Sequence, residues 1–332
     1  MAARPSTTRK PRLTLKDVAE VLGVSRTAVS NAFNRPGELS DALRADILDK
    51  ARELGYFGPD PAARALRSGQ VRQVAVVFGH ALGPVFEDPL SIEFLRGVAG
   101  ELDARGMSMQ LVPDMGRTTS LAYAFQTTAN ALIVHGEVDA ALAPEVRAFS
   151  KPLVLVDAEV ADVPSVRMDE RGGAAAAMER TLSRRPDRVL VLSPIHGSSS
   201  SVTTHRSRGY ISAARHLGFD LGCMDWLEIA EPRPGEQPGR IEDYLQQLPA
   251  RTKLAVLGTT DTMALAALQV LEGHQQVDVV SVVGFDDIPA AAAAGLTTMR
   301  QHSAQKGRLA VRQVLDGEES DPLPFELVVR RT

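Results

Sequence analysis

The chain has 332 residues, of which 44% are apolar and 23% charged, a composition typical of a globular protein with about two domains. Its single cysteine, Cys223, excludes an intramolecular disulfide and a multi-cysteine zinc site, and no apolar run is long enough to span a membrane. No apolar stretch follows the basic N-terminus, as it would in a signal peptide, so we expect a cytoplasmic protein with no membrane partner.

The formal net charge of -4 argues against a nucleic-acid partner when the chain is taken as one block, but this charge is unevenly distributed. Residues 1–70 hold 12 Lys and Arg against 8 Asp and Glu, whereas the rest of the chain holds 25 against 33. A basic head on an acidic body is typical of a nucleic-acid-binding module joined to a different domain. Residues 1–12 are basic but have no apolar period, so we expect a disordered tail there.

Two short helices are predicted directly after this tail. Thr14 is a helix N-cap, and Asp17 stands three residues later, where an acid favours the start of a helix. Gly23 ends this helix and Ser25 caps the next. Two short helices joined at a glycine turn form a helix-turn-helix, with a generic helical hairpin as the alternative.

A third helix and a linker complete the head. Ser40 caps the third helix and Gly55 closes it, so residues 13–57 are predicted to form a small three-helix domain. A Gly-Pro-Asp-Pro break then precedes the helical run 62–67, which is too short to be stable alone in water. Residues 58–70 are therefore predicted to be a linker that needs a partner in order to fold.

The body, residues 71–332, alternates apolar runs with helical stretches. Runs of three to five apolar residues suit parallel strands that are buried on both faces, and helices are predicted between them, for example at 92–104, 173–183 and 262–271. The predicted strands are 74–78, 109–112, 132–134, 153–156, 189–192, 254–257 and 279–283. This alternation predicts an α/β doubly wound fold, in which ligands bind beyond the carboxyl ends of the strands.

The common motifs of enzymes on such folds are missing. The sequence has no GxGxxG after the first strand, no P-loop, no HExxH and no GxSxG. Its seven histidines and one cysteine show no metal-ligand spacing, and the serine run 198–201 fits a flexible loop better than a phosphate loop. We therefore predict no enzymatic activity, no metal and no cofactor.

Two segments of the head, 13–34 and 43–69, resemble the lactose/galactose repressor (LacI/GalR) family of bacterial transcription regulators. The body resembles the same family in segments 92–107, 205–219, 255–271, 282–301 and 323–331, of which VGFDDIP at 283–289 is the most diagnostic. The resemblance implies a helix-turn-helix head, a hinge helix and a periplasmic-binding-protein-like core of two doubly wound parallel-sheet subdomains. We place the N-subdomain at about 71–165 plus 297–320 and the C-subdomain at about 166–296 plus 321–332.

The resemblance also implies the residues that contact DNA. The second helix is expected to lie in the major groove, and its base-reading positions are Arg26, Thr27 and Asn31. Arginine pairs bidentately with guanine and asparagine with adenine, which suits this role. The backbone of the DNA is expected to be held by Thr14, Ser25, Ser30 and Asn34. In the minor groove the hinge is expected to place Ala63, Leu66 and Arg67, with Leu66 wedged between base steps. Packing of Leu66 on its own domain is the alternative.

The resemblance to the family also implies the residues that contact the effector. They are Arg206, Asp286, Asp169, Asp157 and Thr260. Carboxylates accept from hydroxyls and a guanidinium donates in a fork, so this lining suits sugars and polyols. The alternative is that Arg206 forms a structural ion pair with one of the acids. Several departures limit the comparison. Thr260 and Glu170 stand where members of the family often have asparagine, the alanine run 290–294 lacks a common proline, and Trp226 cannot be assigned to a sugar-stacking site.

The sequence as a whole predicts a sequence-specific DNA-binding transcriptional regulator. Repression is the commoner outcome in the family, and a sugar or related metabolite bound between the two core subdomains is expected to control affinity for the operator. A head reads one half-site, so we expect a homodimer on a pseudo-palindromic double-stranded operator. The alternative is a sugar-binding protein without DNA function, and an enzyme on an α/β fold is the further rival.

Overall fold

A computed structural model describes residues 13–54, 56, 73–79, 81–112, 127, 129–138, 140–194, 201–230 and 239–332. The chain divides into two compact units, Met1–Val71 and Arg72–Thr332. The predicted tail and the predicted hinge residues Ala63, Leu66 and Arg67 lie outside the described residues, so what was predicted for them stays a prediction.

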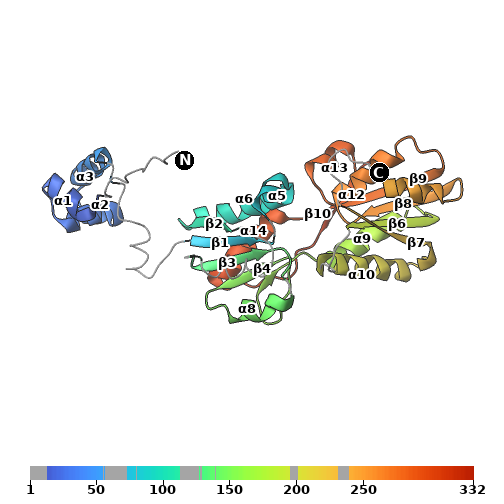
Figure 1. The fold of residues 1–332 in the computed structure, drawn as a ribbon, viewed down its shortest axis with the longest axis horizontal. Coiled ribbons are helices and arrows are strands. Elements are labelled where there is room, and N and C mark those ends of the chain that lie inside the picture. The colour runs from blue at the N-terminus through green and yellow to red at the C-terminus, as the bar shows by residue number, and fades with distance from the viewer. Residues whose placement is uncertain are drawn as a thin grey trace, which may run out of the picture. The chain divides into compact units, whose positions relative to one another are not determined.

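The described residues of the smaller unit form three helices (Figure 1), and each of these begins at a hydroxyl N-cap as predicted. The elements are α1 (Leu15–Leu22), α2 (Arg26–Asn34), the short 3-10 turn η1 (Pro36–Glu38) and α3 (Asp41–Glu53). Thr14 and Asp17 form a complete capping box, and Gly23 ends α1 in the left-handed conformation with φ 65°. The apolar faces of the three helices meet in a core of Val18, Ala19, Val29, Ala32, Ile47, Ala51 and Tyr56.

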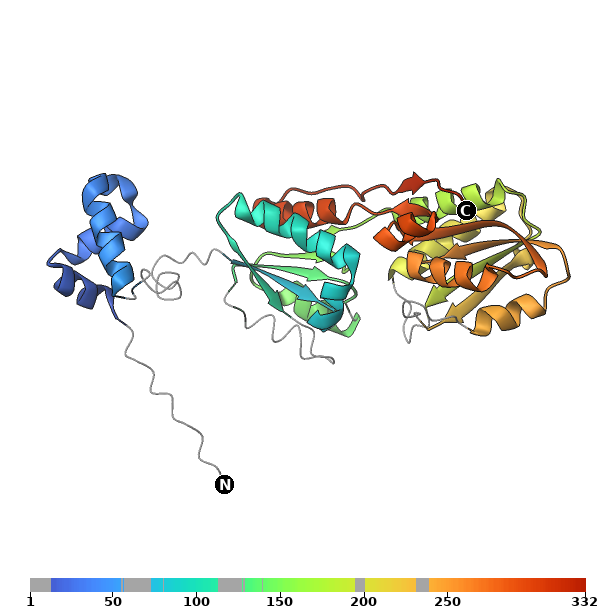
Figure 2. The same cartoon turned by 90° about the horizontal axis from the view of Figure 1, so that it is seen from above.

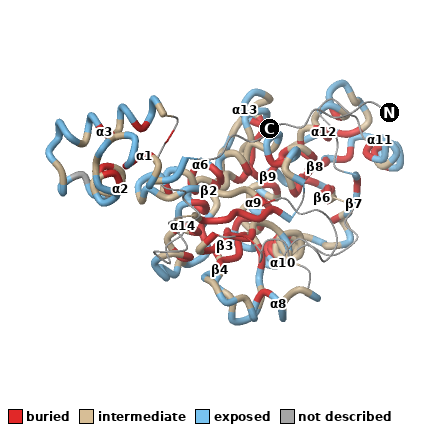
Figure 3. Tube along the Cα trace, turned by 60° about the vertical axis from the view of Figure 1, so that its left-hand side comes forward, coloured by how far each residue is buried: buried red, intermediate tan, exposed pale blue. Residues whose placement is uncertain are grey.

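The larger unit has two lobes, each built on its own sheet. The first lobe has a five-stranded parallel sheet in the order β2-β1-β3-β4-β5. Its strands are β1 (Gln73–Phe78), β2 (Ser108–Val112), β3 (Ala131–His135), β4 (Leu153–Val156) and β5 (Ser165–Val166). Its helices are α5 (Leu82–Glu87), α6 (Pro89–Asp103), η2 (Ala140–Leu142), α8 (Ala143–Ala148) and α14 (Ser303–Asp316). Helices α6 and α14 pack on one face of the sheet and α8 on the other, so side chains on both faces of the strands are buried (Figures 1 and 3).

The second lobe has a six-stranded sheet in the order β11-β10-β9-β8-β6-β7, in which β11 alone is antiparallel to its neighbour. Its strands are β6 (Arg188–Pro194), β7 (Met224–Ile229), β8 (Thr252–Gly258), β9 (Val277–Asp286), β10 (Thr297–Arg300) and β11 (Glu326–Val328). Its helices are α9 (Glu170–Leu182), α10 (Ser201–His216), η3 (Leu221–Cys223), α11 (Gly239–Gln246), α12 (Asp261–Leu271) and α13 (Pro289–Ala294). Helices α9 and α10 cover one face and α11 and α12 the other.

All seven predicted strands are present, and the structure adds four that the apolar pattern did not reveal: β5, β7, β10 and β11. One predicted boundary is wrong. Residues 297–300 were assigned to the N-subdomain, but they form β10, which pairs with β9 and β11 in the sheet of the second lobe. The sequence of this strand is Thr-Thr-Met-Arg, which has no apolar run that would predict a strand. Its first three residues are nevertheless buried, because the strand lies between two neighbours inside the sheet.

Three segments connect the lobes. The chain passes from β5 to α9 through residues 167–169, from β10 to α14 through 301–302, and from α14 back to β11 through 317–325, as Figure 2 shows. The first and third segments are joined by a parallel bridge between Met168 and Leu323, flanked by two backbone hydrogen bonds of 2.7 and 2.8 Å. Among the described helices, none is both long and apolar enough to cross a membrane.

Candidate functional site

Helix α2 presents polar side chains to solvent on the side away from the core of the head. Val29 and Ala32 are buried, while Arg26 and Thr27 are exposed on the first turn and Asn31 is half-buried one turn later. The helical period fixes this division, because residues three and four apart share a face. The predicted base-reading residues therefore lie on α2 outside the packed core.

Three of the four predicted contacts to the DNA backbone lie at helix ends, and Ser30 lies in the middle of α2. The Thr14 hydroxyl donates to Asp17 Oδ2 at 2.7 Å and accepts from the Asp17 N–H, and the Ser25 hydroxyl accepts from a backbone N–H of α2. Ser30 is half-buried in α2, and Asn34 is the last residue of that helix. The positive ends of the α1 and α2 dipoles lie beside Thr14 and Ser25, where a phosphate is favoured.

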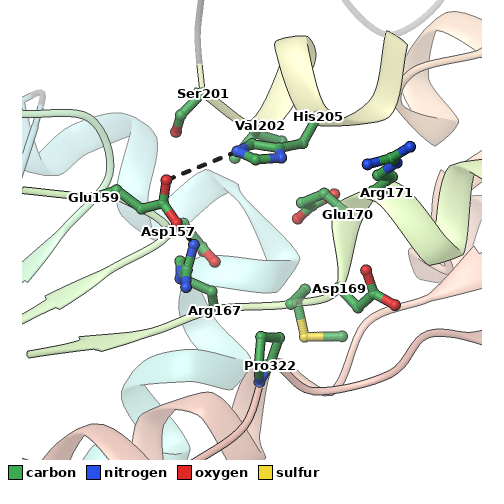
Figure 4. Close-up of a pocket in the computed structure, with 11 residues that line it drawn as sticks. Asp157, Glu159, Arg167, Asp169, Glu170, Arg171, Ser201, Val202, His205 and Pro322 are labelled. Atoms are coloured by element: carbon green, nitrogen blue, oxygen red, sulfur yellow. Dashed lines mark ion pairs between the residues drawn. The ribbon is translucent and has the colours of Figure 1, made fainter. Parts of the chain in front are cut away.

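A pocket of about 200 Å³ lies between the two lobes of the larger unit (Figure 4). Asp157 and Glu159, which follow β4, face Glu170 on α9 and His205 on α10. The remaining lining comes from Arg167, Met168, Asp169, Arg171, Ser201, Val202 and Pro322. The volume is below the roughly 300–1,000 Å³ of pockets for drug-sized ligands, so it suits a small metabolite.

Arg206 on α10 is almost wholly buried and makes a dense set of contacts directly behind Glu170. Its Nε donates to Glu170 Oε2 at 2.5 Å, one terminal nitrogen donates to the carbonyl oxygen of Thr259, and the other lies 3.8 Å from Asp286 Oδ1. The guanidinium also stacks 4.1 Å from the centre of the Phe285 ring. Burial by itself lowers the pKa of Arg206, but Glu170 and Asp286 raise it above its ordinary value, so the arginine is charged.

Two of the predicted effector acids lie at strand ends in strained backbone. Asp157 follows β4 with φ 58°, and Asp286 ends β9 with φ 115°, both in the region that disfavours side chains with a Cβ. Burial raises the pKa of Asp286 to about 8, against the opposing effect of Arg206. Burial also works to raise the pKa of Asp157, but Lys306, 2.5 Å away, and His135 bring it below its ordinary value.

A hydrogen-bonded path links these acids across the lobes. Lys306 on α14 donates to Asp157 Oδ2 and to Gln301 Oε1, the latter at 3.1 Å. Gln301, in the second connecting segment, donates in turn to Asp286 Oδ1 at 2.5 Å, and Asp286 faces Arg206. The path thus runs from the pocket wall of the first lobe to the buried arginine of the second.

The other two predicted effector residues cap helices. Asp169 caps α9 by accepting from the Gly172 N–H at 2.9 Å, and Thr260 caps α12 by accepting from the Met263 N–H at 3.3 Å. Of the five predicted residues, Asp157 and Asp169 line the pocket.

Arg206 and Asp286 do not line the pocket. Arg206 contacts Glu170, which does line it, and Asp286 lies beside Arg206. The structure thus pairs Arg206 with acids, the arrangement of the alternative interpretation.

No role at the site is assigned from the sequence to three residues of this network: Glu170, Gln301 and Lys306. For Glu170 the signal is its departure from the asparagine that the family often has at that position. Lys306 stands in a helix whose sequence gives no sign that a lysine will be only 3% exposed, and only the fold brings it to Asp157. Among the described residues, no group of three or more His, Cys, Asp or Glu could hold a metal ion.

Comparisons with known proteins agree with this architecture. Residues 14–58 match the model of bacterial regulatory proteins of the lacI family, and residues 178–332 match the periplasmic binding protein-like domain. An HTH-type transcriptional regulator of Mycobacterium tuberculosis is 32% identical over 98% of both chains.

Two solved structures share the fold. The lac repressor dimer bound to operator and the anti-inducer ONPF matches with a TM-score of 0.77 at 22% identity, covering 97% of this chain and 98% of that one. The complex of the transcriptional regulator CelR with cellobiose matches with a TM-score of 0.63 at 23% identity, covering 96% and 99%. The predicted fold class and resemblance are confirmed: the chain belongs to the lacI family of bacterial regulatory proteins.

Proposed function

We propose that this chain is a sequence-specific DNA-binding transcriptional regulator whose affinity for its operator changes when a small molecule binds in the pocket between the lobes. The observation that carries the proposal is the geometry of α2. Its N-terminus is capped by Ser25, its inner face packs in the three-helix core, and Arg26 and Thr27 are exposed on its first turn. A helix held in this way can enter a major groove with its N-terminal residues against base edges.

In this proposal Arg26 and Asn31 read bases, Thr27 adds a hydroxyl contact, and Thr14, Ser25, Ser30 and Asn34 position the DNA backbone. The hinge residues Ala63, Leu66 and Arg67 enter the minor groove, where Leu66 separates two base steps. One head covers one half-site, so two copies of the chain on a pseudo-palindromic operator complete the reading. Repression is the proposed outcome of binding, and the place of action is the cytoplasm, where the operator is.

The pocket is proposed to sense a ligand and to have no catalytic role. Its carboxylates and hydroxyl suit hydroxyl-rich ligands, and the structurally similar regulator CelR was solved with cellobiose. A volume of about 200 Å³ favours a sugar unit or a related small metabolite. Among the predicted residues, Asp157 and Asp169 are proposed to meet the ligand directly, while Arg206 and Asp286 support the wall behind it. Thr260 caps α12 next to Thr259, whose carbonyl oxygen accepts from Arg206.

The test begins with an operator selected by the full-length protein from randomised duplexes. Binding of R26A and N31A to that operator is then measured by fluorescence anisotropy at fixed salt. Each variant should lose roughly 1–3 kcal/mol of binding free energy, the value of one good base contact. The matched control is R52A, which removes an exposed arginine from α3 of the same head.

The comparison with R52A separates base reading from general charge. If R26A and R52A weakened binding equally, α2 would not be the reading helix. If no duplex were enriched at all, the DNA function would be lost and a plain ligand-binding protein would remain.

A further inference from the structure

Glu170 occupies a position that decides the charge of the pocket. It is the first residue of α9, it lines the pocket, and it is only 8% exposed although it is a carboxylate. Its Oε2 lies 2.5 Å from Arg206 Nε, and Arg206 is itself only 5% exposed. A buried charge of this kind is tolerated only with its partner in place.

The second acid near Arg206, Asp286, is a weaker counter-charge than Glu170. Asp286 lies farther from the guanidinium, at 3.8 Å, and accepts a hydrogen bond from Gln301. Burial raises its pKa to about 8, so at neutral pH Asp286 carries less negative charge than an ordinary carboxyl group. Glu170, at 2.5 Å, is therefore the main counter-charge of Arg206.

The other basic side chains at or next to the pocket wall also contact acids. Lys306, which does not line the pocket, is paired with Asp157, while Arg167 and His205, which line it, both contact Glu159. The remaining pair of opposite charges at the pocket, Arg171 and Asp169, is exposed, so water screens the charge of each. A ligand that brought a carboxylate or phosphate into this pocket would meet no surplus positive charge and would have to displace Glu170 from Arg206.

We propose that Glu170 is the specificity-determining residue for ligand charge: by neutralising Arg206 it admits uncharged, hydroxyl-rich ligands and excludes those with a carboxylate or a phosphate. The carboxylate keeps lone pairs that can accept from a ligand hydroxyl while it holds Arg206. This inference rests on the proposed function only in taking the pocket as the ligand site.

The inference is tested by measuring how the full-length chain without DNA binds three probes. The probes are inorganic phosphate, glucose 6-phosphate and glucose, and glucose is the uncharged counterpart of glucose 6-phosphate. Affinities are measured by isothermal titration calorimetry at constant ionic strength in a buffer free of phosphate. Wild type should bind neither anion appreciably, whereas E170Q should bind both about 10- to 100-fold more tightly, the value of one freed charge-assisted hydrogen bond. A second variant, E170N, removes the same charge with a shorter amide, so the result does not depend on whether one particular amide packs well against Arg206.

Three controls locate the effect. E170D keeps the charge and should gain nothing. E159Q removes one acid from the same pocket, but its partner Arg167 is partly exposed, so the gain should stay below about threefold. The gain of E170Q should persist in E170Q/R171Q, because the exposed Arg171 is not the proposed anion ligand.

Three results would overturn the inference. They are wild-type binding of either anion as tight as that of E170Q, a folded E170Q with no gain, and equal gains in E170Q and E159Q. Failure of the DNA experiments would leave these titrations unaffected, since no operator is present in them. The two proposals can therefore fail separately.

Discussion

Asp261 shows how one buried carboxyl group is held at the carboxyl end of the second-lobe sheet. It is the first residue of α12 and is fully buried. Its two oxygens accept from the Thr298 hydroxyl at 2.5 Å and the Ile288 N–H at 2.9 Å. A Cβ at position 284 would collide with this carboxyl group, so the glycine of the VGFDD segment makes the room for it. Burial raises the pKa of Asp261 to about 7, against the opposing effect of these hydrogen bonds.

This raised pKa predicts a pH-dependent stability. The folded state keeps the Asp261 proton up to about pH 7, whereas the unfolded chain releases it near pH 3.8. Its contribution to the free energy of unfolding is therefore fully present below pH 3.8 and is lost as the pH rises through 7, a change on the order of 4 kcal/mol. D261N should flatten the fall in stability over this range, because an amide does not titrate and can still accept from Ile288 and donate to Thr298.

The measurement is denaturant unfolding at several pH values. It is followed by the fluorescence of Trp226, the only tryptophan in the chain, which lies in the same sheet system on β7. The quantity compared is the difference between wild type and D261N at each pH. Parallel curves for the two proteins between pH 4 and 8 would contradict the assignment.

At the scale of elements, the packing of α6 against α14 depends on two glycines. A Cβ at Gly97 would collide with the carbonyl oxygen of Ala304, and a Cβ at Gly307 would collide with that of Phe94. The two helices are about 200 residues apart along the chain, and their close approach holds α14 on the first lobe. In the sequence α14 stands between β10 and β11, which both belong to the sheet of the second lobe.

G97A should therefore destabilise the protein by roughly 1–3 kcal/mol, because backbone atoms cannot move aside as a flexible side chain can. G100A is the matched control on the same helix. Its Cβ would have no atom within 4 Å, and alanine favours a helix over glycine by up to about 1 kcal/mol. Scanning calorimetry should show a lower Tm for G97A and an unchanged or higher one for G100A. The reverse order would refute the packing argument.

At the scale of the whole molecule, the net charge of -4 hides a balance of +4 in residues 1–70. Charges more than about 10 Å apart in 0.1 M salt are largely screened, so the charge balance of the head matters more for DNA binding than the net charge of the chain. We therefore predict that operator affinity falls steeply as the salt concentration rises. The logarithm of the association constant, plotted against the logarithm of the salt concentration, should have a slope of about -0.9 for each phosphate contacted.

An uncharged ligand in the pocket should show almost no salt dependence, which contrasts with the operator. Titrations of both at 50 to 300 mM potassium chloride, by anisotropy and calorimetry respectively, check the two slopes on one preparation. A flat slope for the operator would contradict the role proposed for the head.

The sequence by itself determined the local structure of this protein. The caps Thr14, Ser25 and Ser40 and the stop at Gly23 act within one turn of helix, and the seven apolar runs mark strands that are buried on both faces. These signals depend on neighbours along the chain, so they could be interpreted without a fold.

The tertiary structure alone decided the pairings. Arg206 contacts Glu170, which is 36 residues away along the chain, and Lys306 contacts Asp157, which is 149 residues away. The polar strand β10 belongs to the second lobe because it pairs with β9 and β11. No local pattern encodes such contacts, since burial and the partner of each charge are set by the order of strands in the sheets. The sequence thus named an arginine for the pocket, and only the fold showed that a glutamate already neutralises it.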